Sequence, residues 1–215
     1  MSGGPSTAES AWAREALRLN TRYIEEIVIA WGLCPWAAQA WRSGAVTRRV
    51  LPDAAFDPGA VLTFIDELAE LDELAPQTAI GLVIWPRLAL DAAAFAGAAE
   101  QLRRADRGRR PPGDASPFLM AAFHPDLRDA APVDAASLVP FIRRTPDPTL
   151  QLVRTTLLDA LARSGRDVSS EVAKANFATV AARTPSALDA ALRDIRDDRA
   201  DSYARLRRLG EPPRG

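Results

Sequence analysis

Hydrophobic and polar positions follow a helical spacing in three segments of the first half of the chain. Between Ala8 and Leu33, apolar residues recur every three or four positions, which predicts a long N-terminal helix that Gly32 and Pro35 end. The same spacing predicts a helix that starts at Asp57, and another from Asp91 to about Arg104. Helices therefore form the larger part of this half.

Three short apolar runs between these helices predict β-strands: Ala45–Leu51, Ala79–Trp85 and Phe118–Phe123. Strands that alternate with helices form βαβ units, whose crossovers make neighbouring strands parallel in nearly all cases. The three strands should then point in the same direction. Their ends at Leu51, Trp85 and His124 should therefore lie at one carboxyl edge of the sheet. Open α/β sheets bind their ligands at that edge.

The second half of the chain has a less regular pattern. Leu138–Ile142 is predicted to be a fourth strand, at a sheet edge because it contains Pro140. Its direction stays open: a hairpin loop would make it antiparallel, and a crossover would bring the following arginines to His124. A helix is predicted from Thr145 onward, and two shorter helices over Glu171–Leu209, split near Thr184. The helix predicted from Thr145 has an apolar stripe of Leu150, Val153, Leu157 and Leu161.

These elements predict an α/β fold: a small, mostly parallel sheet of three or four strands with flanking helices, a long N-terminal helix and C-terminal helices. Residues 8–210 are expected to form a single domain, with flexible termini at 1–7 and 211–215.

Composition narrows the functional classes. Of 215 residues, 47% are hydrophobic and 26% are charged, and the formal net charge is -1. Such a balance creates no global field for a polyanion, so no nucleic-acid partner is expected. The apolar stretches are too short to span a membrane, so no membrane partner is expected. No secretion signal is evident, which predicts a cytoplasmic protein. The sequence leaves the oligomeric state open.

Cys34 is the single cysteine and follows the predicted N-terminal helix, directly before Pro35. It is a candidate nucleophile, but the dipole at a helix C-terminus disfavours a thiolate. The alternative is a small buried hydrophobic residue, a common fate of free cysteine.

His124 is the single histidine and is expected at the carboxyl edge, with Asp126 nearby. A carboxylate beside an imidazole is typical of a general acid or base. The alternative is a histidine that caps the strand and hydrogen-bonds the following loop. No spacing of metal ligands is present, so no metal is expected.

Arg143 and Arg144 precede the predicted helix start, where guanidinium groups and helix amides favour a carboxylate or phosphate. Asp147 complicates this interpretation, because it is also a natural helix cap. Trp85 is a candidate wall of a pocket, although core packing is the commoner use of tryptophan. No phosphate loop or dinucleotide fingerprint occurs, so no cofactor is expected.

Four ordered motifs carry a family resemblance. They are Ile24–Ile29 leading to Gly32–Ala37, Val83–Pro86, Ala122–Pro125 and Arg144–Leu150. Together they resemble the bacterial proteins of the domain of unknown function 1415 family, over about Tyr23 to Asn176. The resemblance implies no established activity.

The resemblance matches motifs of the family to individual residues of this chain. The family's Cys-Pro and Phe-His-Pro elements match Cys34 and His124, and the arginine of its Asn-Arg-Ser-Pro-Tyr-Pro element corresponds to Arg144. Asn and Tyr of that element are replaced here by Arg143 and Asp147. A further family histidine corresponds to Gln151, which puts inheritance of any activity in doubt.

Two hypotheses follow. The first is a small-molecule enzyme with His124 as general acid or base, Arg144 and Arg143 binding an anionic substrate, and Cys34 as nucleophile or pocket wall. Trp85 and Asp126 complete this predicted pocket. The second is a non-catalytic ligand-binding or protein-interaction module, in which His124 bonds only to backbone groups.

Overall fold

The computed structural model describes residues 7–34, 37–74, 80–111, 113–127, 132, 134–156 and 168–210. The predicted flexible termini fall outside these ranges, except for Thr7.

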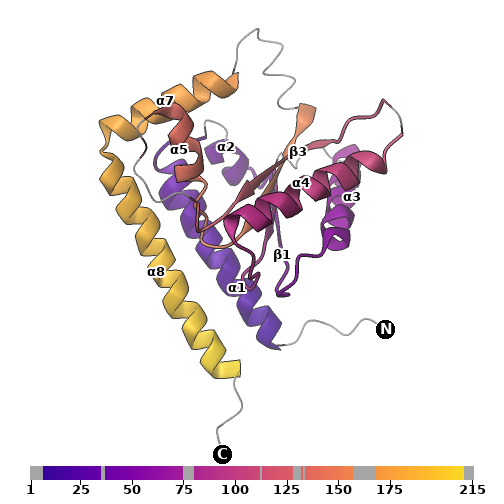
Figure 1. Cartoon of the computed structure of the whole chain (residues 1–215), viewed down its shortest axis with the longest axis horizontal. Coiled ribbons are helices and arrows are strands. Elements are labelled where there is room, and N and C mark those ends of the chain that lie inside the picture. The colour runs from indigo at the N-terminus through magenta and orange to yellow at the C-terminus, as the bar shows by residue number, and fades with distance from the viewer. Residues whose placement is uncertain are drawn as a thin grey trace, which may run out of the picture.

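A four-stranded sheet lies at the centre of the molecule, in the order β1-β2-β4-β3 (Figure 1). Its strands are β1 (Val46–Val50), β2 (Ile80–Ile84), β3 (Phe118–Phe123) and β4 (Thr149–Arg154). β1 and β2 are parallel, with Val46 opposite Ile80, whereas β4 is antiparallel to both β2 and β3. The expectation of a mostly parallel sheet is therefore wrong, because an antiparallel strand separates β2 from β3.

The first three strands nevertheless point in one direction, since β2 and β3 both oppose β4. They alternate with α3 (Pro58–Leu74) and α4 (Ala92–Gly108), as the hydrophobic pattern predicts. The mixed α/β class is thus confirmed, and the carboxyl ends of β1, β2 and β3 share one edge.

Two predicted elements are wrong. Leu138–Ile142 belongs to a helix, α5 (Ala135–Ile142). Asp134 caps the start of this helix: its carboxylate accepts a hydrogen bond from the Ser137 N–H, and the Ser137 hydroxyl oxygen accepts one from the Asp134 N–H. This capping box is a sequence signal for a helix start that outweighs a five-residue apolar run.

The second error is the helix predicted from Thr145, where the structure has β4. Leu150 and Leu152 alternate with Gln151, and they pack on one face of the sheet. The segment thus fits a period of two as well as a helical stripe. Leu157 and Leu161, which suggested the helix, lie outside the described residues.

The sheet is covered on both faces by separate hydrophobic clusters. α3 and α4 cover one face, where Phe95, Val83 and Leu150 are fully buried. A Cβ on Gly81 would lie 2.5 Å from Leu68 Cδ1, so this glycine allows the close approach of α3.

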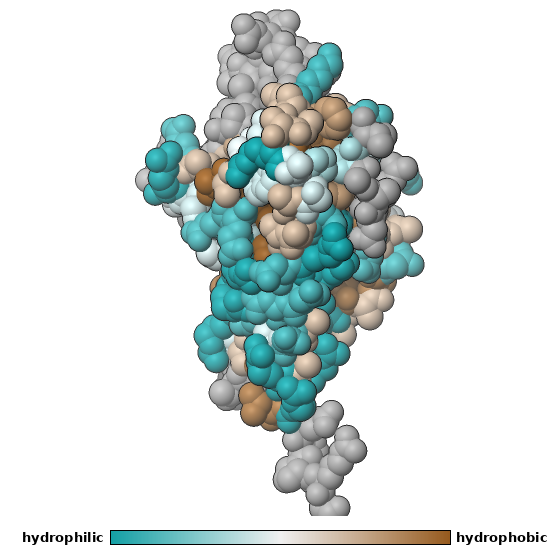
Figure 2. All heavy atoms as spheres, turned by 90° about the vertical axis from the view of Figure 1, so that its left-hand side faces the viewer, coloured by the Kyte–Doolittle hydropathy of each residue, from teal (hydrophilic) through white to brown (hydrophobic). Residues whose placement is uncertain are grey.

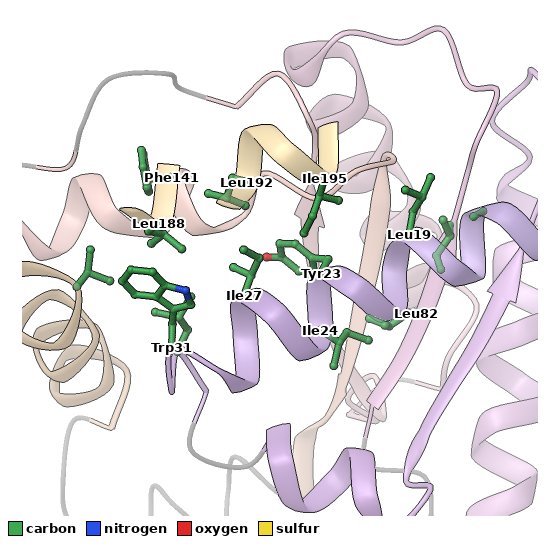
Figure 3. Packing of buried hydrophobic residues seen from close by; sticks show 14 of the residues in the cluster. Leu19, Tyr23, Ile24, Ile27, Trp31, Leu82, Phe141, Leu188, Leu192 and Ile195 are labelled. Atoms are coloured by element: carbon green, nitrogen blue, oxygen red, sulfur yellow. The ribbon is translucent and has the colours of Figure 1, made fainter. Parts of the chain in front are cut away.

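The opposite face is covered by the N-terminal helix and by C-terminal helices. The N-terminal helix begins as α1 (Thr7–Arg22), becomes the π-helix η1 (Tyr23–Ile29) and ends at Gly32, whose φ is +63°. Leu192 and Ile195 pack beside Tyr23 and Ile27 of η1 (Figure 3). A short helix, α2 (Ala37–Arg42), follows η1.

The two C-terminal helices are α7 (Val168–Ala182) and α8 (Pro185–Gly210), separated at Thr184 as predicted. α8 runs beside α1 (Figure 1), and the α8 side of the molecule is covered mostly by hydrophilic residues (Figure 2). In the described ranges, no helix has both the length and the apolar character that crossing a membrane requires.

An ionic network joins α1 to α8. Arg18 and Arg22 both donate to the Asp198 carboxylate, at 2.8 and 2.6 Å, and Arg22 also pairs with Asp194 at 2.7 Å. The hydrogen bond from Arg18 lowers the pKa of Asp198 below its ordinary value of 3.8. Burial raises this pKa, and the hydrogen bond from Arg22 lowers it further.

We expect Asp198→Asn to lower the free energy of unfolding at pH 7 by about 1 kcal/mol. A depressed pKa stabilises the fold above the unfolded pKa, and this contribution disappears as pH falls through the folded pKa. The difference from wild type, measured by urea unfolding, should therefore close as the pH falls below the ordinary aspartate pKa of 3.8. Asp201→Asn, an exposed carboxylate on the same helix, is the control; equal effects of both substitutions would contradict the prediction.

Candidate functional site

The loop before β4 lies at the carboxyl edge of the other three strands. Trp85 N–H donates to Pro148 O at 3.0 Å, and His124 N–H donates to Arg143 O at 3.1 Å. Residues 144–148 therefore run between the ends of β2 and β3, and all of them are buried. Arg143 and Arg144 reach the edge that carries His124, although through an antiparallel strand rather than a crossover.

Both ring nitrogens of His124 bond to backbone groups. Nδ1 accepts the Asp126 N–H at 3.2 Å, so Nε2 carries the proton and donates to Leu90 O at 2.9 Å. The Asp126 carboxylate, whose side chain is 74% exposed, lies 3.7 Å from Nδ1, which is beyond hydrogen-bond distance. The imidazole is 3% exposed and packs near the Phe95 ring. This arrangement matches the strand-capping alternative for His124.

Nitrogen NMR of His124 tests this assignment. We expect the neutral tautomer with hydrogen on Nε2 and none on Nδ1 at pH 7.5, because a backbone N–H already donates to Nδ1. A His124→Asn variant serves as the control that assigns the signals. A proton on Nδ1, or rapid exchange between the tautomers, would contradict the bonding pattern.

The structure separates Cys34 from His124. Cys34 follows η1, next to Leu33, which belongs to the cluster on the η1 face of the sheet. The His124 ring instead lies beside Phe95, in the cluster on the opposite face. Cys34 is half-buried, and Pro35 lies outside the described residues. The two side chains thus lie next to different hydrophobic clusters, and a joint Cys and His site stays a prediction from the sequence.

Trp85 is fully buried on the α3 and α4 face, between Phe56 at 5.2 Å and Phe95 at 5.5 Å between ring centroids. Its Nε1–H has no hydrogen-bond partner among the described residues. Trp85 thus serves as core at the sheet edge, and no part of it is exposed to a ligand in this conformation.

Asp147 is a buried carboxylate that binds α8. It is 1% exposed and accepts hydrogen bonds from Arg199 Nε and from the Tyr203 hydroxyl, both at 2.7 Å. Burial raises the pKa of the Asp147 carboxyl, against the opposing effect of Arg199. The expected role of Asp147 as a helix cap is wrong, since a strand follows it; it anchors the C-terminal helix instead.

Tyr203→Phe should lower the free energy of unfolding by about 2 kcal/mol, since it removes one hydrogen bond to a buried charged group. The ring packing on Trp12, at 4.6 Å between centroids, is retained in this variant. Urea unfolding followed by circular dichroism measures the effect. Ser202→Ala, which deletes a hydroxyl at the neighbouring position, is the control; an unchanged unfolding midpoint for Tyr203→Phe would contradict the anchor role.

A small open cleft lies between the β4 loop, η1 and α8. Its apolar lining consists of Tyr23, Pro125, Pro146, Leu192 and Ile195, and its polar lining of Arg144, Thr145, Arg193 and Arg196. Arg144 was predicted from the sequence, but Tyr23 and the α8 residues were missed. The available signal was the helical spacing of Leu192, Ile195 and Arg196 on an otherwise charged helix.

Arg144 is the innermost cation of the cleft. It is 7% exposed, donates from Nε to Phe141 O at 3.0 Å and stacks over the Phe141 ring at 3.9 Å. Its terminal nitrogen donates to Asp189 Oδ1 at 2.8 Å, and Arg193 pairs with the other oxygen of Asp189. One carboxylate is thus shared by two guanidinium groups.

Tyr23 lines the cleft, whereas Arg143 does not. The Tyr23 hydroxyl donates to Ile142 O, and burial raises the pKa of the phenol. Arg143 is not part of the lining; its guanidinium stacks over Phe123 at 5.3 Å, and burial lowers its pKa. No group of three or more histidine, cysteine, aspartate or glutamate residues in the described ranges is arranged to hold a metal ion.

These features define a mixed α/β protein with a cationic cleft at the edge of its sheet. The chain belongs to the family described as protein of unknown function (DUF1415), which matches residues 15–190. No curated protein and no solved structure matches the chain. The cleft residues Leu192, Arg193, Ile195 and Arg196 follow the matched range.

Proposed function

We propose that this protein binds a small anionic molecule, a carboxylate or a phosphate, in the cleft between the β4 loop and α8. The observation that carries the proposal is the convergence of Arg144, Arg193 and Arg196 from two distant segments. Guanidinium groups are the side chains best suited to carboxylate and phosphate, because their N–H groups match both oxygens of such an anion.

The position of Asp189 supports this proposal. Its two carboxylate oxygens each accept a hydrogen bond from a different guanidinium group, those of Arg144 and Arg193. This pairing with a carboxylate of the protein itself supports the proposal that the two side chains suit an anion of this shape.

The bonding of His124 favours binding over catalysis. A general acid or base must reach the reacting group within hydrogen-bond distance. Both nitrogens of His124 are already engaged with backbone groups, and this residue is not among those that line the cleft. We therefore propose the ligand-binding alternative, and an enzymatic role of His124 stays a prediction from the sequence.

We expect Arg196→Gln to weaken binding of inorganic phosphate and of butyrate about tenfold, since it removes one charge-assisted contact. Titration of isotope-labelled protein, followed by amide NMR, gives both the affinity and the location. Signals of Tyr23, Thr145 and residues 192–196 should shift.

Arg205→Gln is the matched control, because it removes the same charge from an exposed position further along α8. It should leave both affinities nearly unchanged. Equal losses in the two variants would show that binding reflects only the general charge of α8, and the proposal would then fail.

A further inference from the structure

We infer that the outer edge of β1 binds an extended peptide as an additional strand, with an acidic side chain of that peptide next to Arg48. This surface is separate from the cleft, and the inference does not depend on the proposed function. The observations that carry it are the backbone hydrogen bonds of the two outer strands and the charge on β1.

β1 is an outer strand of the sheet, and β2 is its neighbour on the inner side. Ile80 N–H donates to Ala45 O at 3.1 Å, and Leu51 N–H donates to Ile84 O at 2.9 Å. Along a strand, residues whose backbone groups bond to one neighbour alternate with residues whose groups point the other way. β1 therefore bonds to β2 through its odd-numbered residues.

The backbone groups of the even-numbered residues, Val46, Arg48 and Val50, point away from β2. Among the residues that the structure describes, no hydrogen bond reaches the N–H or C=O groups of these three. Every residue of β1 is partly exposed. A row of exposed, unpaired backbone groups is a template for pairing with another extended segment.

The opposite edge of the sheet, that of β3, is largely covered by side chains. The Ser116 hydroxyl donates to Phe118 O at 3.0 Å and accepts the Phe118 N–H at 3.3 Å. Arg103 of α4 donates to Met120 O, from Nε at 3.3 Å and from Nη2 at 3.1 Å. Groups that cover an edge in this way hinder the addition of a strand. Of the two edges, that of β1 is therefore the more open.

Arg48 gives the β1 edge a preference for an acidic partner. Its Nη1 donates to Leu17 O at 3.1 Å and to Thr21 Oγ1 at 2.9 Å, and its guanidinium lies over the Trp41 ring at 4.9 Å. These partners are uncharged. Burial lowers the pKa of the Arg48 guanidinium, and the charge of Glu25 offsets part of this effect. A carboxylate beside Arg48 would add a charge-assisted hydrogen bond.

The side chains of β1 define the complementary peptide. Val46, Arg48 and Val50 share the face of the sheet that η1 covers, whereas Arg49 lies on the other face and pairs with Glu67. Side chains directly opposite each other on neighbouring strands interact. An acidic residue flanked at alternate positions by two β-branched apolar residues therefore matches the η1 face of β1, in either strand direction.

A second copy of this chain fits the β1 edge less well. Full antiparallel pairing of two β1 strands sets Val46 opposite Val50, and Arg48 opposite the same residue of the other copy. Like charges directly opposite each other destabilise a sheet. The charge on β1 therefore favours a separate acidic peptide over self-association.

The test uses a cyclic peptide with the strand sequence Thr-Val-Thr-Glu-Thr-Val-Thr and a matched peptide with Lys in place of Glu. In the protein alone, the amides of Val46, Arg48 and Val50 should exchange hydrogen faster than that of Arg49, which donates to β2. The Glu peptide should slow exchange at the first three positions. It should also bind about fivefold more tightly than the Lys peptide, as measured by NMR titration.

Arg48→Gln should abolish the preference for the Glu peptide, whereas Arg49→Gln, on the other face of β1, should retain it. Because Arg48 is partly buried, the two peptides compared on the wild-type protein decide the matter if the variant does not fold. Methylation of the peptide amide nitrogens that face β1 should abolish binding. Undiminished binding of the methylated peptide, equal affinities for the Glu and Lys peptides, or no binding would each overturn the inference, and none of these results bears on the cleft.

Discussion

A carboxylate taken out of water must be paired, and the partners of the buried Asp147 carboxylate join two distant parts of the chain. Desolvating it costs several kcal/mol unless charged and polar partners replace the lost water. Those partners, Arg199 and Tyr203, both lie on α8, more than fifty residues later in the chain. These hydrogen bonds therefore fix the position of α8 relative to the start of β4. The same helix carries the outer wall of the cleft and the carboxylates that bind α1.

At the carboxyl edge of the sheet, the side chains on the two faces of the sheet form different environments. On the α3 and α4 face, His124 links the loop after β3 to Leu90 and packs against Phe95, beside the buried Trp85. On the η1 face, Arg144 and Tyr23 open toward α8. The first arrangement is buried and largely apolar, and the second is a cationic cleft. The antiparallel entry of β4 produces this division, because it places residues 144–148 between the ends of β2 and β3.

Several elements were predictable because their patterns are local. The strands β1, β2 and β3 are short apolar runs, and the helices between them show clear apolar stripes. β4 was missed because its leucines also satisfy the start of a helical stripe. α5 was missed although Asp134 and Ser137 form a capping box, since its brief apolar run around Pro140 also resembles an edge strand. Of the candidate site, Arg144 and the shared edge were predictable, whereas Tyr23, Leu192 and Arg196 were not.

The α/β class, the common direction of three strands and the edge at which their ends meet could be predicted from the sequence, because these features depend on periodicity and on short connections. The folded chain places β4 between β2 and β3, sets the His124 ring beside Phe95 and brings α8 to the cleft. The physical reason is that each of these features depends on pairing between distant residues. Asp147 shows no local signal of its partners Arg199 and Tyr203, which meet it only when the chain is folded.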